Sequence, residues 1–165
     1  MRRSLFLSLF CMLACSYAMS ADWSRYKPRT FQTIIKALPI QDKNESSGVS
    51  FGFEDEFPSI VKVVFLGKTR KIPASRRSAM EMAVKVMSLN PELLNMFQSE
   101  LLFTEGKTTY WLPVQEQSVP YYFEELKVGD LVDLYLIILA TRKNVDGKID
   151  HIFLVNEFQR VESKK

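Results

Sequence analysis

The stretch LVDLYLIILAT (Leu131–Thr141) carries the strongest strand signal in the chain. A second long run with many apolar residues, IDHIFLVNEFQRV (Ile149–Val161), follows the linking residues NVDGK (144–148). An Asp-Gly pair between two such runs favours a tight hairpin turn, because both positions tolerate a positive φ. We therefore predict that the two runs pair as a long antiparallel hairpin.

Shorter strand signals precede this hairpin. The run Ile60–Leu66 is rich in β-branched and aromatic residues, and the GKT that follows (67–69) can turn the chain so that Arg70–Ile72 returns beside it. Two further runs, Leu101–Phe103 and Thr108–Leu112, flank a short loop that contains glycine. These segments predict two more hairpins.

Helical signals occupy much of the remaining sequence. Thr30 can cap a short helix whose apolar residues, from Phe31 to Leu38, recur on one face. A longer helix is predicted over Ser75–Leu89, with Ala79, Met82, Ala83, Val86 and Leu89 on its apolar face and the neighbouring arginines away from it. Residues 91–98 and 121–126 each predict a short helical segment.

Together these elements predict an α+β fold. Five or six antiparallel strands with short helices inserted suggest a small β-barrel or strongly curved sheet of the oligonucleotide/oligosaccharide-binding (OB) or SH3-like kind. The form GDLV (129–132), which enters the long strand, resembles what such barrels use. A flat sheet with its helices on one face remains the alternative.

The first residues have the pattern of an export signal. Arg2 and Arg3 precede an apolar run from Leu5 to Ala14, and Ala18 and Ser20 offer small residues two apart. The run is about ten residues long, whereas a span of the bilayer needs about 20. We therefore predict a signal peptide over residues 1–20, an N-terminal extension with one short helix over 21–58, and a single β-rich domain over 59–165. The mature protein is expected to be periplasmic or secreted.

Cys15 provides a second interpretation of this segment. MLAC (12–15) resembles a bacterial lipobox, in which the cysteine is lipidated and becomes the mature N-terminus. The product would then be an outer-membrane lipoprotein, and only in that case is membrane attachment expected. Cleavage after Ser20 would instead remove both cysteines, Cys11 and Cys15, and with them any disulfide or thiolate site.

The charged residues favour some partners over others. The formal net charge is +3, and the loss of Arg2 and Arg3 with the signal lowers it to +1. Such a chain has no overall attraction for nucleic acid, so we expect no nucleic-acid partner. One basic cluster can still contact an anionic surface such as phospholipid or lipopolysaccharide, or can be a solvated face. It consists of Lys68, Arg70, Lys71, Arg76 and Arg77.

Aromatic residues supply the candidate ligand site. YWLP (110–113) and YYF (121–123) form the densest aromatic patch, and we select Trp111, Tyr121 and Tyr122 as possible ligand contacts. On a small barrel such rings can stack on a sugar, a peptide or another planar ligand. Strand alternation puts Tyr110 and Trp111 on opposite faces, so at least one of them is expected in the core.

We predict no catalytic, cofactor-binding or metal-binding residue. His151 is the single histidine, and Asp150 beside it in a strand points to the opposite face and cannot orient it. No phosphate loop, dinucleotide fingerprint or nucleophile motif is present. The sequence thus favours an exported, non-enzymatic binding or assembly module whose partner is a protein, a saccharide or another envelope component. The alternatives are a lipoprotein tethered at Cys15 and a carboxylate-dependent hydrolase of cell-wall saccharide, which two carboxylates facing each other across a pocket would favour.

Overall fold

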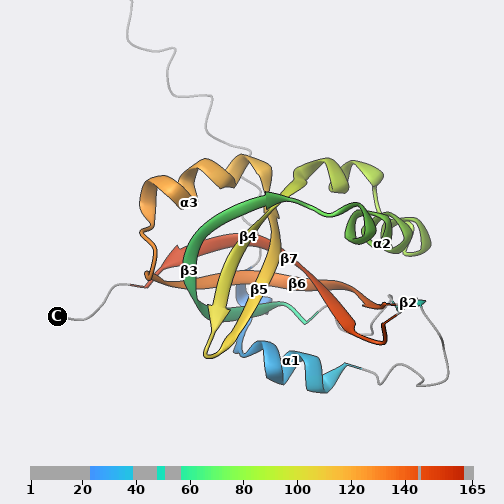
Figure 1. The fold of residues 1–165 in the computed structure, drawn as a ribbon, viewed down its shortest axis with the longest axis horizontal. Helices are drawn as coiled ribbons and strands as arrows, with labels where there is room; N and C mark the ends of the chain where they lie inside the picture. The colour runs from blue at the N-terminus through green and yellow to red at the C-terminus, as the bar shows by residue number, and fades with distance from the viewer. Residues whose placement is uncertain (1–22, 39–47, 51–56, 145, 162–165) are drawn as a thin grey trace, which may run out of the picture.

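A computed structural model of the chain describes residues 23–38, 48–50, 57–144 and 146–161. The predicted signal peptide over residues 1–20, including Cys15, lies outside the described residues. The fold is α+β, with one mixed sheet and a few short helices (Figure 1). The α+β class agrees with the prediction, but the prediction of antiparallel strands throughout is wrong, because β1 pairs with β3 and β5 with β7 in parallel.

The sheet curls partly into a ring. Its strands follow the order β1-β3-β4-β5-β7-β6-β2, and β3 pairs with β6 as well as with β4. The described strands are β1 (Lys27–Arg29), β2 (Gly48–Ser50), β3 (Ser59–Lys71), β4 (Phe97–Glu105), β5 (Thr108–Gln115), β6 (Leu131–Lys143) and β7 (Ile149–Arg160).

The ring has one weak seam. On one side β6 pairs with β3 from Ser59 to Val64, all in one antiparallel register. On the other side β5 and β7 run parallel, and a single residue pair, Val114 with Val155, joins them. We call this junction between β5 and β7 the seam.

The predicted long hairpin is confirmed. β6 and β7 are antiparallel, with Lys143 opposite Ile149 at the turn and Val132 opposite Arg160 at the far end. Gly147 adopts a φ of 79°, and its backbone N–H donates to the carbonyl of Asn144 at 2.9 Å. The hairpin of β4 and β5 is confirmed as well, with both strands longer than predicted.

The predicted turn at 67–69 is wrong. β3 continues to Lys71, and its pairing with β4 shifts register between Phe65 and Thr69. Gly67 sits in this irregularity with a φ of 66°. The glycine therefore belongs to a bulge that bends one strand, and does not join two strands.

Helices cover the ring on several sides. They are η1 (Trp23–Arg25), α1 (Phe31–Ala37), α2 (Ala74–Val86), η2 (Pro91–Met96), η3 (Glu116–Ser118) and α3 (Val119–Glu125). Figure 1 shows α1 and α3 on opposite sides of the ring. Phe31 and Ile34 of α1, and Tyr122 of α3, belong to the same core cluster that fills the ring. Thr30 caps α1 as predicted, because its hydroxyl accepts from the N–H of Thr33 at 3.0 Å.

α2 packs on the outside of the ring and forms a second core. Its buried residues Ala79, Met80, Ala83 and Val84 meet apolar side chains of β6 and β7. Met82 and Val86, which the sequence placed on the buried face, are 49% and 57% exposed. The buried face of α2 instead consists of the residues at helical spacing from Arg76, namely Ala79, Met80, Ala83 and Val84.

Candidate functional site

The structure separates the three predicted aromatic contacts. Tyr122 lies in the core with 1% of its surface exposed. Its ring stacks on that of Phe158, with centroids 4.0 Å apart. Burial raises the pKa of Tyr122 above its ordinary value, and the nearby charge of Glu157 adds to this effect. Tyr122 therefore supports the fold and offers almost no surface to a ligand.

Trp111 and the basic cluster come together, which the sequence did not indicate. Trp111 is half-buried on β5, and the guanidinium carbon of Arg70 lies 4.2 Å from the centroid of its ring. Arg76 of α2 donates from Nη1 to the backbone carbonyl of Trp111 at 2.9 Å. Two predicted constellations thus share one surface.

Beneath this surface lies a network of paired charges. Glu100 of β4 has no exposed surface, and its carboxylate accepts from Arg70 Nε at 2.7 Å and from Arg76 Nη1. Arg76 also binds Asp150 of β7 with two donors, Nη2 at 2.6 Å and Nε at 3.1 Å. Arg142 contacts the same carboxylate at 3.3 Å. The network contains three guanidiniums and two carboxylates, so its sum is positive.

Arg76 acts as a clamp across the seam. It contacts β4 through Glu100, β5 through the carbonyl of Trp111, and β7 through Asp150. Burial by itself lowers the pKa of Arg76, but the hydrogen bonds and charges of Asp150 and Glu100 outweigh it, and the pKa is raised. The guanidinium therefore stays charged, and it links the hairpin of β4 and β5 to β7 across the junction where the backbone ladder has a single residue pair.

The other basic residues differ in their availability. Arg77 donates from Nη1 to the carbonyls of Leu94 and Phe97, at 2.8 and 2.7 Å, so it is engaged in holding η2 against α2. Lys68 and Lys71 are exposed, and neither forms an ion pair with a residue in the described ranges. Of the five predicted cations, Arg70, Lys68 and Lys71 thus face solvent.

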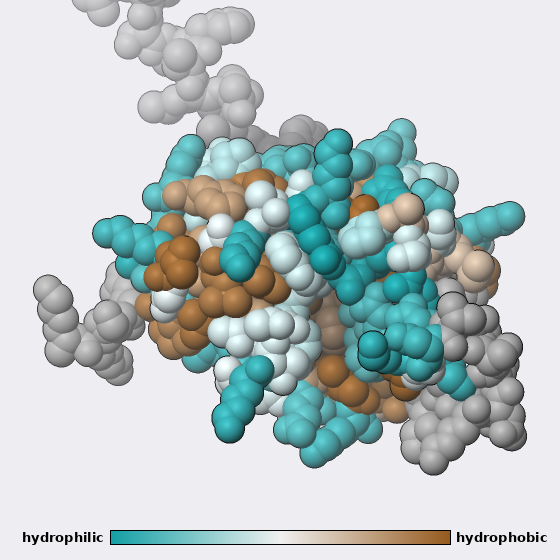
Figure 2. All heavy atoms as spheres, in the orientation of Figure 1, coloured by the Kyte–Doolittle hydropathy of each residue, from teal (hydrophilic) through white to brown (hydrophobic). Residues whose placement is uncertain are grey.

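A hollow of about 220 Å³ opens at the seam, which we call the seam hollow. Figure 2 shows a recess with apolar atoms at its floor and hydrophilic residues beside it. Its lining includes Arg76, Tyr110, Trp111, Asp150, His151 and Phe153.

His151 lies on the wall of the seam hollow. Its Nδ1 is 3.2 Å from the hydroxyl of Thr141. Burial lowers the pKa of His151, and the charge of Asp150 opposes this only in part. The ring is therefore neutral near pH 7, and it presents an uncharged imidazole to the hollow.

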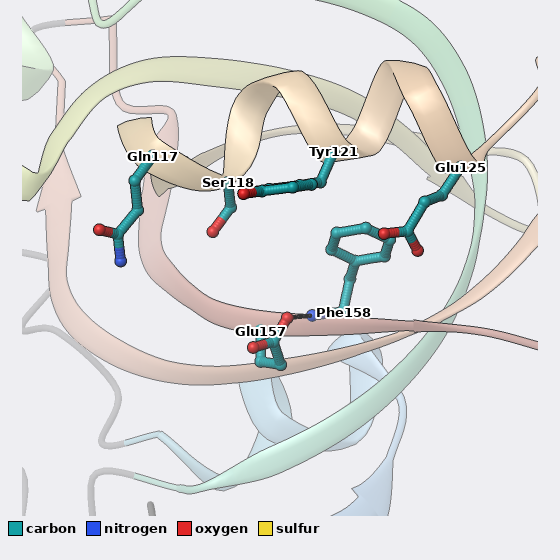
Figure 3. Close-up of a pocket in the computed structure, with 6 residues that line it drawn as sticks. All are labelled: Gln117, Ser118, Tyr121, Glu125, Glu157 and Phe158. Atoms are coloured by element: carbon teal, nitrogen blue, oxygen red, sulfur yellow. Dashed lines mark hydrogen bonds between the residues drawn. The ribbon is translucent and has the colours of Figure 1, made fainter. Parts of the chain in front are cut away.

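Tyr121 lines a different hollow. This α3 pocket, of about 390 Å³, lies between α3 and the end of β7 (Figure 3). Its walls are Gln117, Ser118, Tyr121, Glu125, Glu157 and Phe158. Tyr121 is 55% exposed there. Trp111 and Tyr121 therefore cannot be parts of one compact site.

Sequence reasoning missed the acidic half of the charge network, Glu100 and Asp150, as well as Arg142. The only signal for Glu100 was its position directly before the apolar run Leu101–Phe103. A charge in such a place is tolerated when it is paired. Its partners come from another strand and from α2, so they could not be named from the sequence.

No group of three or more His, Cys, Asp or Glu side chains in the described ranges is arranged to hold a metal ion. Likewise, none of the helices in the part of the chain that the structure describes is long and apolar enough to cross a membrane. In comparisons with known proteins, the chain matches no family model, no curated protein and no solved structure.

Proposed function

We propose that this protein is an exported, non-enzymatic binding module, and that its ligand lies on the surface formed by Trp111 and Arg70 beside the seam hollow. The export part rests on the N-terminal signal pattern, with Ala21 near the start of the mature chain. The binding part rests on the geometry of the described residues.

The order of the strands supports an OB-type barrel for this module. Such barrels are partly open five-stranded rings, and they bind ligands on the second and third strands and the loops beside them. Counted within the ring, β4 and β5 are the second and third strands. The segment that carries α2 joins the first two strands, and the turn at Gly147 joins the last two. Trp111 and Arg76 belong to these elements.

The observation that carries the proposal is the cation–π contact between Arg70 and Trp111. An indole ring gives broad apolar contact with a planar or ring-shaped ligand, and a guanidinium binds a carboxylate with paired hydrogen bonds. The side chain of Arg70 is 39% exposed although it also binds Glu100. A sugar that carries a carboxylate matches both groups, so we assign an acidic saccharide as the ligand class.

Electrostatics favour the same ligand class. The network below Trp111 has one more guanidinium than it has carboxylates. An excess of positive charge at the rim of a hollow attracts anions, and added salt screens this attraction. A neutral saccharide can contact the Trp111 ring, but it gains no electrostatic attraction from this positive charge.

Fluorescence of Trp111 tests this proposal. The chain has two tryptophans, so Trp23→Phe leaves Trp111 as the single emitter. In this background we expect an oligogalacturonate to change the emission saturably, and a maltooligosaccharide of equal length to bind more weakly. Arg70→Gln should weaken oligogalacturonate binding about ten-fold, which corresponds to about 1.4 kcal/mol.

Arg25→Gln is the matched control, because Arg25 is an exposed arginine on η1 and does not line the seam hollow. It should leave the affinity for oligogalacturonate unchanged. The proposal fails if neither saccharide alters the emission, or if Arg25→Gln weakens binding as much as Arg70→Gln does.

A carboxylate-dependent hydrolase is the second candidate, because Glu125 and Glu157 line one pocket. Hydrolysis of a glycosidic bond needs one carboxyl group that keeps its proton, which an apolar enclosure provides. Both residues are exposed on an open pocket. Binding is therefore the function that the geometry supports best.

A further inference from the structure

The α3 pocket is a second, independent place for a ligand. Its volume of about 390 Å³ falls in the range typical of small-molecule sites. It lies between α3 and β7, and its lining shares no residue with that of the seam hollow. Its chemistry must therefore be considered separately.

Aromatic rings form part of the pocket wall. The Phe158 ring rises from β7 toward α3 (Figure 3). Tyr122, buried in the core, stacks against Phe158 at 4.0 Å and so restricts its movement. Tyr121, the next residue of α3, is 55% exposed. The pocket thus offers one fixed ring and one exposed ring.

Two carboxylates complete the wall. Glu125 comes from the end of α3 and Glu157 from β7, and neither forms an ion pair with any residue that the structure describes. Arg160 of β7 binds the carboxylate of Asp130 at 3.0 Å and donates to the backbone carbonyl of Glu125 at 3.5 Å, and it forms no ion pair with either glutamate. Glu157 accepts from the N–H of Phe158 at 2.9 Å, which orients its carboxylate. The pocket wall therefore carries two carboxylates that no described ion pair neutralises.

We propose that the α3 pocket binds a small organic cation, such as a polyamine. An ammonium group gains from the faces of aromatic rings and from carboxylates, and both are present here. The methylene stem of an amine would contact Phe158, and Gln117 and Ser118 would accept hydrogen bonds from its N–H groups. A saccharide acid, the ligand proposed for the Trp111 surface, is repelled by Glu125 and Glu157.

Spermidine is the probe, and backbone amide chemical shifts of the full chain are the readout. We expect saturable shifts at residues 117–125 and 157–158, and none with 1,8-octanediol, which is uncharged. The paired substitutions Glu125→Gln and Glu157→Gln keep the shape of the pocket and remove its charge. They should lower the affinity for spermidine at least ten-fold, and Tyr121→Ala should lower it about three-fold.

Glu116→Gln is the matched control, because Glu116 is exposed on η3 and does not line the pocket. It should change the affinity less than two-fold. Equal losses in Glu116→Gln and in the paired variant would show diffuse attraction only and would overturn the proposal. So would shifts that do not saturate. Arg70→Gln should leave spermidine binding intact, so failure at one site is distinguishable from failure at the other.

Discussion

At Glu100 the sheet buries a full carboxylate, and this single residue organises the surface around Trp111. Bringing a charge out of water costs several kcal/mol unless it is paired. Here Arg70 and Arg76 both bind it, and the side chain has no exposed surface. Removing one member of such a buried pair typically costs about 3–5 kcal/mol, whereas the intact pair adds little net stability. The network therefore positions Arg70 and Arg76, and breaking it by a single substitution should destabilise the fold.

Of Gly67 and Gly147, Gly67 is the glycine at which replacement by alanine should lower the free energy of unfolding more. Its φ is 66°, and a Cβ built on it would lie 2.5 Å from Cγ2 of Val128. Gly147 has a similar φ of 79° but open space around it. We expect Gly147→Ala to lower the free energy of unfolding by about 1 kcal/mol through backbone strain alone. Gly67→Ala should cost clearly more, as measured by urea denaturation.

Val128→Ala supplies the internal check on this prediction. Val128 is 71% exposed, so its truncation removes the clash at little cost of its own. In that background, the cost of Gly67→Ala should fall to the level of Gly147→Ala. Equal costs of the two glycine substitutions in the otherwise unchanged protein would contradict the contact.

At the scale of elements, α1 closes one end of the ring. Phe31 has no exposed surface, stacks on Tyr110 at 4.2 Å, and lies 5.0 Å from the Phe153 ring. Its backbone N–H donates to Glu105 at 3.2 Å, which ties the start of the helix to β4. A helix expected in an extension before the β-rich domain thus contributes to the core of that domain.

Phe31→Ala tests this role. Truncation of a buried phenylalanine typically costs about 3–5 kcal/mol, so we expect a loss of that size in the free energy of unfolding. Gln32→Ala, on the exposed face of the same helix, should change it by less than about 0.5 kcal/mol. If Phe31→Ala leaves the stability unchanged, α1 does not pack against the ring in solution.

The sequence predicted those elements whose signals are local. The hairpin of β6 and β7 depends on two adjacent runs and one turn, so it could be predicted. α2 could be predicted as a helix, and its buried face only in part: Ala79 and Ala83 are buried as predicted, whereas Met82 and Val86 are exposed. The face that carries Met80 and Val84 packs on β6 and β7, and Arg76 pairs with Glu100 and Asp150, all of which are distant in the sequence.

The same limit applied to the candidate site. Trp111 and Arg70 were each selected, yet their contact depends on the register of β3, β4 and β5. Because Gly67 was interpreted as a turn, Arg70 was expected on a returning strand and not on the end of β3. Tyr122 was selected for its chemistry, and only the packing of α3 on the ring shows that it is buried.

For the whole molecule, the ring closes by two different means. β3 and β6 close it with a backbone ladder, whereas β5 and β7 share one residue pair and depend on the Arg76 clamp. The contacts of Arg76 with Trp111 and Asp150 therefore help to hold β5 and β7 together at the seam. His151 lies on the wall of the seam hollow, so its ionisation bears on the stability of the whole fold.

Stability should fall when the solution is acidified through the titration range of His151. Burial lowers the pKa of His151 in the folded state, whereas in the unfolded chain it has its ordinary value of about 6.5. As the pH falls below that value, the unfolded chain takes up the proton first. Proton uptake by the unfolded chain lowers the free energy of unfolding until the pH falls below the pKa of His151 in the folded state. Between the two pKa values, the free energy of unfolding therefore rises with pH.

The readout is the difference in free energy of unfolding between the protein and its His151→Gln variant, measured by urea denaturation at pH 7.5 and pH 5.5. Other titrating groups occur in both proteins and cancel in this difference. The free energy of unfolding of the protein, minus that of the variant, should be smaller at pH 5.5 than at pH 7.5. Only the unmutated protein has a histidine that burial keeps neutral while the unfolded chain is protonated. A difference that grows on acidification would mean that the charge of Asp150 outweighs burial and that protonated His151 is stabilised by the fold. In that case the imidazolium would add a further positive charge to the rim of the seam hollow, and acidic saccharide would bind more tightly at the lower pH.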